Sequence, residues 1–219
     1  MASFALITEG ITDQVVFETL LLACLGADTA VNPMQPLRDA TDESRQTTHG
    51  GWERVLEWCN PVRFNEILSV NDFIVLQIDT DQGEHPNFGV PLTENGQERT
   101  EVALIDDVMA LIASKLGESW AQFAERILFA IAVHSTECWI LPLVAKVPAD
   151  LRRTKSCASH LTRLAGLKSE SDLKTYRTFE ALVAPIQKSR RNKQWQENLK
   201  KCRENNHSLA AFLDSLPAA

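Results

Sequence analysis

The sequence predicts an α/β fold whose sheet is parallel in large part. Three segments are almost continuously apolar and have the length of buried strands, and helical patterns lie between them. The three strand segments are "SFALITEG" (3–10), residues 73–79 and "RILFAIAVHSTE" (126–137). Buried strands that alternate with helices are typical of a parallel sheet flanked by helices.

Helix signals separate these strand segments. In "TDQVVFETLLLACLG", Thr12 suits a helix N-cap and Gly26 suits the helix end. In "ERTEVALIDDVMALIASKLG", apolar residues at helical spacing predict one buried face, made of Val102, Ile105, Val108, Met109, Ile112 and Leu116. The other predicted elements before residue 130 are an irregular strand and loop at 28–50, a short helix at 50–60 and a long loop at 82–98.

The cysteines predict a reducing compartment. The chain has 219 residues and five cysteines, which show neither CxxC pairing nor a His/Cys cluster at zinc spacing. We therefore expect reduced and mostly buried thiols rather than a disulfide framework. The N-terminus "MASFALITEG" has no basic start and meets Glu9 early, so we expect no signal peptide. These features favour a cytoplasmic location.

One stretch, residues 128–147, has the length of a membrane span. His134 and Glu137 fall near its middle. A charged carboxylate there costs roughly 2.5–3.5 kcal/mol in a bilayer. We therefore predict a buried strand followed by a helix, and no membrane partner.

Carboxylates follow each predicted strand. Glu9 follows the first, Asp79 and Asp81 end the second, and Glu137 ends the third. In an open α/β sheet, ligands bind beyond the carboxyl ends of the strands. Four carboxylates gathered there, with Asp13 in reach, need a counter-charge. Oxygen ligands suit a hard divalent cation, so we predict a Mg²⁺ or Mn²⁺ site that serves phosphodiester chemistry.

Three motifs resemble the Toprim domain. "ITEGITD" (7–13) and "IDTD" (78–81) resemble its strand-end Glu-Gly and its Asp-x-Asp, and "HSTECWIL" (134–141) is similar to a segment of small Toprim proteins related to the OLD nucleases. The resemblance spans roughly residues 4–145 and implies a metal-binding catalytic domain at 1–145, followed by a helical, basic region at 146–219. It implies that Glu9, Asp79 and Asp81 are catalytic. It also implies a set of metal ligands: Glu9, Asp13, Asp79, Asp81 and Glu137.

The chain also departs from the larger Toprim proteins. It lacks the additional domains of topoisomerases and primases, and it has no GxxxxGK[ST] phosphate loop like that of the ATPase in full OLD proteins. It therefore resembles the stand-alone Toprim effectors of antiphage systems, such as the PARIS-type and retron-type arrangements. That resemblance implies a metal-dependent nuclease acting on DNA or RNA under the control of a separate ABC/AAA-type ATPase. Whether the chain forms a homo-oligomer is left open.

Two alternatives remain. A non-catalytic Toprim module would bind nucleic acid or a partner, but such a module need not retain so many mutually repelling carboxylates. A haloacid-dehalogenase-like phosphatase also uses a strand-end Asp-x-Asp with Mg²⁺, and "LIDD" (104–107) imitates its later acidic pair. In that family a Thr or Val stands two residues after the second Asp, whereas this chain has Gly83 there.

Charge divides the chain. Residues 1–150 carry a net charge of −15 and residues 151–219 a net charge of +8. We predict a helix within 185–206 that puts Trp195, Leu199 and Cys202 on one face and basic residues on the opposite face. The basic residues are Arg190, Lys193, Lys200 and Lys201. Such a face is a solvated surface, or it binds the phosphate backbone or an acidic partner. Lys155 and Lys188 are candidates for a catalytic lysine.

Overall fold

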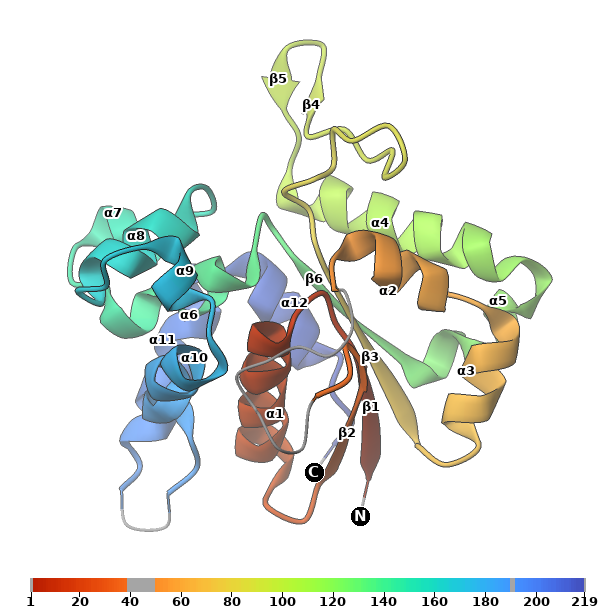
Figure 1. The fold of residues 1–219 in the computed structure, drawn as a ribbon, viewed down its shortest axis with the longest axis horizontal. Helices are drawn as coiled ribbons and strands as arrows, with labels where there is room; N and C mark the ends of the chain where they lie inside the picture. Colours follow the sequence, from red (N-terminus) through yellow and green to blue (C-terminus); the bar gives the residue numbers. More distant parts are fainter. Residues whose placement is uncertain (1, 39–49, 190–191, 219) are drawn as a thin grey trace.

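The computed structural model describes residues 2–38, 50–189 and 192–218 (Figure 1). Its main sheet has four strands in the order β2-β1-β3-β6, and all neighbouring pairs are parallel. The strands are β1 Ser3–Ile7, β2 Ala30–Gln35, β3 Phe73–Asp79 and β6 Ile127–Ala132. The predicted α/β class and parallel sheet are thus confirmed. Pro33 lies in β2, an edge strand, where a missing backbone N–H is tolerated.

Helices cover both faces of this sheet. Alternate residues of a strand point to opposite faces, so Phe4 and Leu6 join one hydrophobic cluster while Ala5 and Ile7 join the other. The first face is covered by α1 Ile11–Leu25, α6 Thr136–Val144, α10 Tyr176–Val183, α11 Gln194–Asn205 and α12 His207–Asp214. The second face is covered by α2 Trp52–Trp58, α3 Pro61–Leu68, α4 Glu101–Leu116 and α5 Trp120–Phe123.

The helices after residue 145 share the core of the first face. Their described elements include α7 Pro148–Leu151, α8 Cys157–Leu164 and α9 Glu170–Leu173, besides α10 to α12. Phe212 of α12 packs against Phe17 and Trp139, at ring centroid distances of 5.2 and 5.9 Å. The Trp139 indole donates a hydrogen bond of 2.8 Å to Ser208 Oγ. The C-terminal helices are therefore docked on the sheet domain, and the domain boundary at 145 stays a prediction.

Several local expectations need correction. Helix α1 begins at Ile11 with Gly10 as N-cap, so Thr12 is not the cap, whereas Gly26 ends the helix as expected. Val102 of α4 is 51% exposed rather than part of the buried face, which includes Leu104 instead. The segment 82–98 is not all loop, because it contains a short hairpin of β4 Thr93–Glu94 and β5 Gln97–Glu98.

The predicted membrane-length segment forms β6 and α6, as expected. None of the helices in the described ranges is long and apolar enough to cross a membrane.

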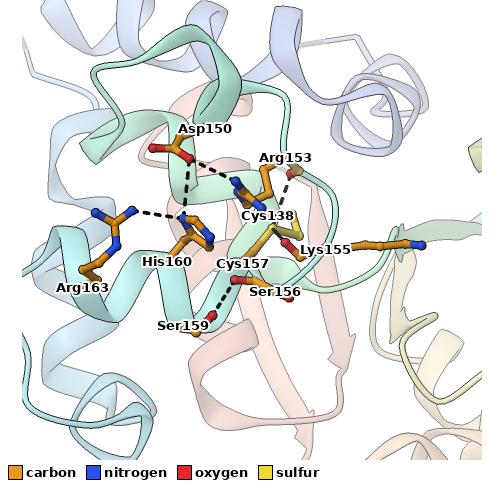
Figure 2. A network of polar contacts seen from close by, with 9 residues as sticks. All are labelled: Cys138, Asp150, Arg153, Lys155, Ser156, Cys157, Ser159, His160 and Arg163. Atoms are coloured by element: carbon orange, nitrogen blue, oxygen red, sulfur yellow. Dashed lines mark hydrogen bonds and ion pairs between the residues drawn. A yellow bond between two sulfur atoms is a disulfide. The ribbon is translucent and has the colours of Figure 1, made fainter.

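The expectation of reduced thiols is wrong for two cysteines. Cys138 of α6 and Cys157 of α8 form a disulfide, with their Cα atoms 5.1 Å apart (Figure 2). Their 19-residue separation has no pattern that predicts pairing. The return of the chain through α7 makes the pairing possible. The cytoplasmic location thereby loses the support of the cysteines and stays a prediction.

Candidate functional site

The carboxyl ends of β1 and β3 bring two of the predicted acids together. The two strands are parallel neighbours, with Ile7 opposite Leu76, so the residues that follow them meet at one edge of the sheet. The carboxylate of Glu9 accepts a 2.7 Å hydrogen bond from the backbone N–H of Asp79. The predicted association of Glu9 with Asp79 is therefore present in the fold.

Gln77, which the sequence analysis did not single out, connects this pair. Its Oε1 accepts a 2.8 Å bond from the Glu9 backbone N–H, and its Nε2 donates a 2.8 Å bond to Asp79 Oδ1. Gln77 is fully buried within β3. A buried amide needs such partners, because an unpaired polar group in a core costs about 1–3 kcal/mol. The signal in the sequence was one Gln in the otherwise apolar run "FIVLQID".

Helix α6 closes the other side of Asp79. The backbone N–H and the hydroxyl of Thr136 both lie 3.2 Å from Asp79 Oδ1. Glu137 follows in the first turn of α6 and is buried. It does not end a strand as expected, because β6 stops at Ala132. The predicted convergence holds nonetheless, because α6 starts beside the carboxyl end of β3.

Asp13 enters the same site from the first turn of α1 and is also buried. The close approach at Gly10 explains the glycine of "ITEGITD". A Cβ atom at position 10 would lie 3.1 Å from Asp13 Oδ2, which is tighter than most such contacts. Gly10 therefore lets the chain turn from β1 into α1 without displacing the Asp13 carboxylate.

These acids line a cleft of about 330 Å³ together with one lysine. Lys174, between α9 and α10, places its Nζ 3.5 Å from a Glu137 carboxylate oxygen. Of the two lysines named from the sequence, Lys155 pairs with Glu98, and Lys188 lies over the Trp195 ring. Lys174 carried no local signal, because only the docking of the C-terminal helices brings it to the sheet edge. The full lining is Glu9, Gly10, Ile11, Thr12, Asp13, Gly51, Asp79, Glu137 and Lys174.

Asp81 lies at the periphery of this site. It is exposed and is not among the residues that line the cleft. Its backbone N–H donates to the carbonyl of His134, whose ring Nδ1 lies 3.2 Å from Thr80 Oγ1. Burial and the neighbouring Lys155 lower the pKa of His134. His134 therefore has structural contacts around the Asp79–Asp81 turn.

The electrostatics of the cleft favour bound protons or a bound cation. Burial, and then the charges of Asp13 and Asp81, raise the pKa of Glu9 to about 8. Burial, and then Glu137, raise the pKa of Asp13 to about 7. Burial and the surrounding carboxylates hold the pKa of Asp79 well above its usual range, and partial desolvation by the neighbouring protein raises that of Asp81. Glu137 in turn raises the pKa of Lys174.

The carboxylates of the cleft suit some metal ions better than others. In residues 2–38, 50–189 and 192–218, no three His, Cys, Asp or Glu side chains are gathered closely enough to form a ready-made metal site. A dense all-protein cage, of the kind that zinc occupies, is thus not formed there. Mg²⁺ differs, because it keeps several waters and binds through one or two carboxylates. The partly buried carboxylates of Glu9 and Asp79 fit that second mode.

Of the four predicted nucleic-acid-binding residues, the three within the described ranges differ in exposure. Arg190 lies outside the described residues. Lys193 is exposed just before α11, which begins at Gln194 rather than directly after Pro185. Lys200 is exposed and lies 3.8 Å from Glu204. Lys201 was expected on the exposed face, but it is partly buried and donates a 3.1 Å bond to the carbonyl of Ala145, because α11 packs against α6.

Comparison of the chain with protein-family models, with curated proteins and with solved structures finds no match. A parallel α/β sheet alone supports many chemistries and identifies none of them. The function must therefore be inferred from the acidic cleft itself.

Proposed function

We propose that the chain is a Toprim-like, metal-dependent nuclease that hydrolyses phosphodiester bonds in DNA or RNA. The observation that supports this most is the partly buried, hydrogen-bonded Glu9–Asp79 pair at the carboxyl edge of adjacent parallel strands. Carboxylates with raised pKa values in a cleft are typical of sites that bind a cation or move protons. The three sequence motifs agree with this order of acids.

Each residue has a role in this proposal. Glu9 and Asp79 would hold a Mg²⁺ or Mn²⁺ ion, with Asp13 and Glu137 as further ligands. Such an ion, when bound, polarises a phosphoryl oxygen and lowers the pKa of a bound water. Gln77 and Thr136 keep Asp79 oriented through their hydrogen bonds. Asp81, exposed beside the cleft, faces the incoming substrate.

Lys174 has a separate role. Its side chain remains 59% exposed while it pairs with the buried Glu137. It is therefore available to a substrate phosphate, and we propose that it stabilises charge on the phosphoryl oxygens or on the leaving oxygen. A role in phage defence, an ABC/AAA-type ATPase partner and a cytoplasmic location belong to this proposal only through the resemblance to stand-alone Toprim effectors.

The two alternative functions, a phosphatase and a binding-only Toprim module, require different properties of the cleft. A haloacid-dehalogenase-like phosphatase needs its later acidic pair at the metal, but Asp106 and Asp107 lie in α4 and do not line the cleft. Asp107 instead pairs with Arg99 at 2.6 Å. A binding-only Toprim module would retain the cleft and lack turnover, so a cleavage assay separates it from the nuclease.

The test is incubation of the purified chain with plasmid DNA and with total RNA, in Mn²⁺, in Mg²⁺ and in EDTA, followed by gel electrophoresis. We expect cleavage that requires the metal and that Asp79→Asn abolishes. Asp106→Asn is the matched control, because it removes one exposed carboxylate far from the cleft lining. Metal-independent cleavage, or full activity of Asp79→Asn, would overturn the proposal.

A further inference from the structure

A second and larger cavity lies along α1, beyond the acidic cleft. Its volume is about 820 Å³, within the range of about 300–1,000 Å³ typical of small-molecule sites. Its walls come from α1, from α10, from residues 187–189 and from the described residues at the start of α11. Figure 1 shows α10 and α11 beside α1 on the same side of the sheet. The lining includes Val15, Leu22, Tyr176, Lys188, Lys193 and Trp195.

The cavity combines aromatic rings with exposed positive charge. Trp195 is partly buried, and the Lys188 ammonium lies 5.8 Å from the centre of its ring. Lys193 is exposed on the same lining. Val15 and Leu22 of α1 add apolar surface opposite these groups. A flat apolar ring beside two ammonium groups suits a ligand that has an aromatic base and a phosphate.

Acidic residues of the same lining favour a nucleotide over an acidic peptide. Glu18, Asp28 and Glu180 line the cavity together with the two lysines, and Glu18 pairs with Arg38 at 2.9 Å. The carboxylates of Asp28 and Glu180 would repel a uniformly acidic segment. A nucleobase instead offers N–H donors to carboxylate acceptors, while its phosphate needs the cationic side. The carboxylates of the lining therefore suit the base of a nucleotide, and the lysines suit its phosphate.

The cavity and the acidic cleft share two structural elements. On α1, Asp13 lines the cleft and Val15 lines the cavity. Near the start of α10, Lys174 lines the cleft and Tyr176 lines the cavity. From Asp13 to Leu22 the helix rises about 13 Å at 1.5 Å per residue. That distance corresponds to about four stacked nucleotides of one strand at 3.4 Å each.

We propose that this cavity binds a nucleotide, with its base against Trp195 and its phosphate at Lys188 and Lys193. The nucleotide is one unit of a single strand whose phosphodiester reaches the acidic cleft, and in this respect the inference rests on the proposed nuclease function. The shared chemistry is that of a nucleoside phosphate, so a free nucleotide is the other source that the experiment must distinguish.

The experiment measures fluorescence anisotropy of a labelled single-stranded octanucleotide with the full chain in EDTA, so that binding is recorded without cleavage. Lys188→Gln and Trp195→Leu are expected to weaken binding about tenfold each, as for loss of a phosphate contact or a stacking contact. Lys188→Gln should also reduce the log–log salt slope by about one. Lys115→Gln is the matched control, because Lys115 is equally cationic and exposed but lies on α4, across the sheet, and does not line the cavity.

Three results overturn or redirect the inference. Wild-type affinity in both Lys188→Gln and Trp195→Leu overturns it, and so does an equal loss in Lys115→Gln. Because Lys188 is exposed, its variant stays informative even if Trp195→Leu fails to fold. If a nucleoside monophosphate binds with dependence on Lys188 while the octanucleotide does not, the strand is excluded and a free nucleotide is the ligand.

Failure of this inference and failure of the nuclease proposal are distinguishable. Octanucleotide binding that depends on Lys188 supports a nucleotide site in the cavity even when no cleavage occurs in Mn²⁺. Cleavage that needs Asp79 but does not change in Lys188→Gln or Trp195→Leu supports the nuclease proposal and overturns the proposed nucleotide site.

Discussion

Glu9→Gln should change how the stability of the metal-free protein depends on pH. In the folded chain the pKa of Glu9 is raised to about 8 and that of Asp13 to about 7, whereas their ordinary values are 4.5 and 3.8. The folded state therefore holds protons that the unfolded chain releases above pH 5. It follows that the free energy of unfolding falls as pH rises from about 5 to about 8.

The slope of stability against pH follows from the number of extra protons that the folded state holds. Each extra proton held by the folded state contributes a slope of about 1.4 kcal/mol per pH unit. Between pH 5 and 7 Glu9 and Asp13 each hold one, which contributes up to about 2.7 kcal/mol per unit to the loss, and Asp79, whose pKa is also raised, adds to the slope. Glu9→Gln removes one of these protons and should make the slope shallower by about 1.4 kcal/mol per unit. The Gln side-chain oxygen can still accept the bond from the Asp79 N–H, so the local geometry is retained.

The assay is urea unfolding in EDTA at pH 5.5, 6.5 and 7.5, followed by far-UV circular dichroism. Asp106→Asn, an exposed change in α4, should reproduce the wild-type slope. Millimolar Mg²⁺ should stabilise the wild type more at pH 7.5 than at pH 5.5, because protons and the cation compete for the same carboxylates. A wild-type stability that is flat or rises over this range, or an unchanged slope in Glu9→Gln, would refute the reasoning.

Three further predictions concern other parts of the site and its support. Lys174→Gln should lower the cleavage rate about 100-fold, because it removes a positive charge at the substrate phosphate, and it should change the free energy of unfolding by no more than about 1 kcal/mol. Lys155→Gln is the control, and equal cleavage rates of the two variants would contradict the proposed role of Lys174. Cys157→Ser should lower the free energy of urea unfolding by about 3 kcal/mol, because the disulfide closes a loop between residues 19 apart in sequence. Titration of free thiols in the denatured wild type should find three thiols, and a result of five would exclude the disulfide. Ser208→Ala should cost about 1–3 kcal/mol, because it leaves the buried Trp139 N–H unpaired, and an unchanged unfolding midpoint would argue against the docking of α12.

Much of the site was predictable from local patterns. The apolar runs of β1 and β3 end at Glu9 and Asp79, and parallel pairing brings strand ends to a common edge. Gly10 follows Glu9 directly in the sequence, and the close approach of Asp13 explains why a glycine stands there. These features are local in the chain, and a short window of sequence contains the residues that produce them.

Tertiary packing alone decided the rest. Lys174 reaches the cleft only because α10 packs on α1, and Cys157 meets Cys138 only because the chain turns back through α7 to α8. Lys201 appeared exposed on a helical wheel, yet α11 packs against α6 and Lys201 bonds to the carbonyl of Ala145. Periodicity reports how apolar one face of a helix is, but it carries no information about which partner lies on the other faces. That choice depends on contacts between residues far apart in sequence.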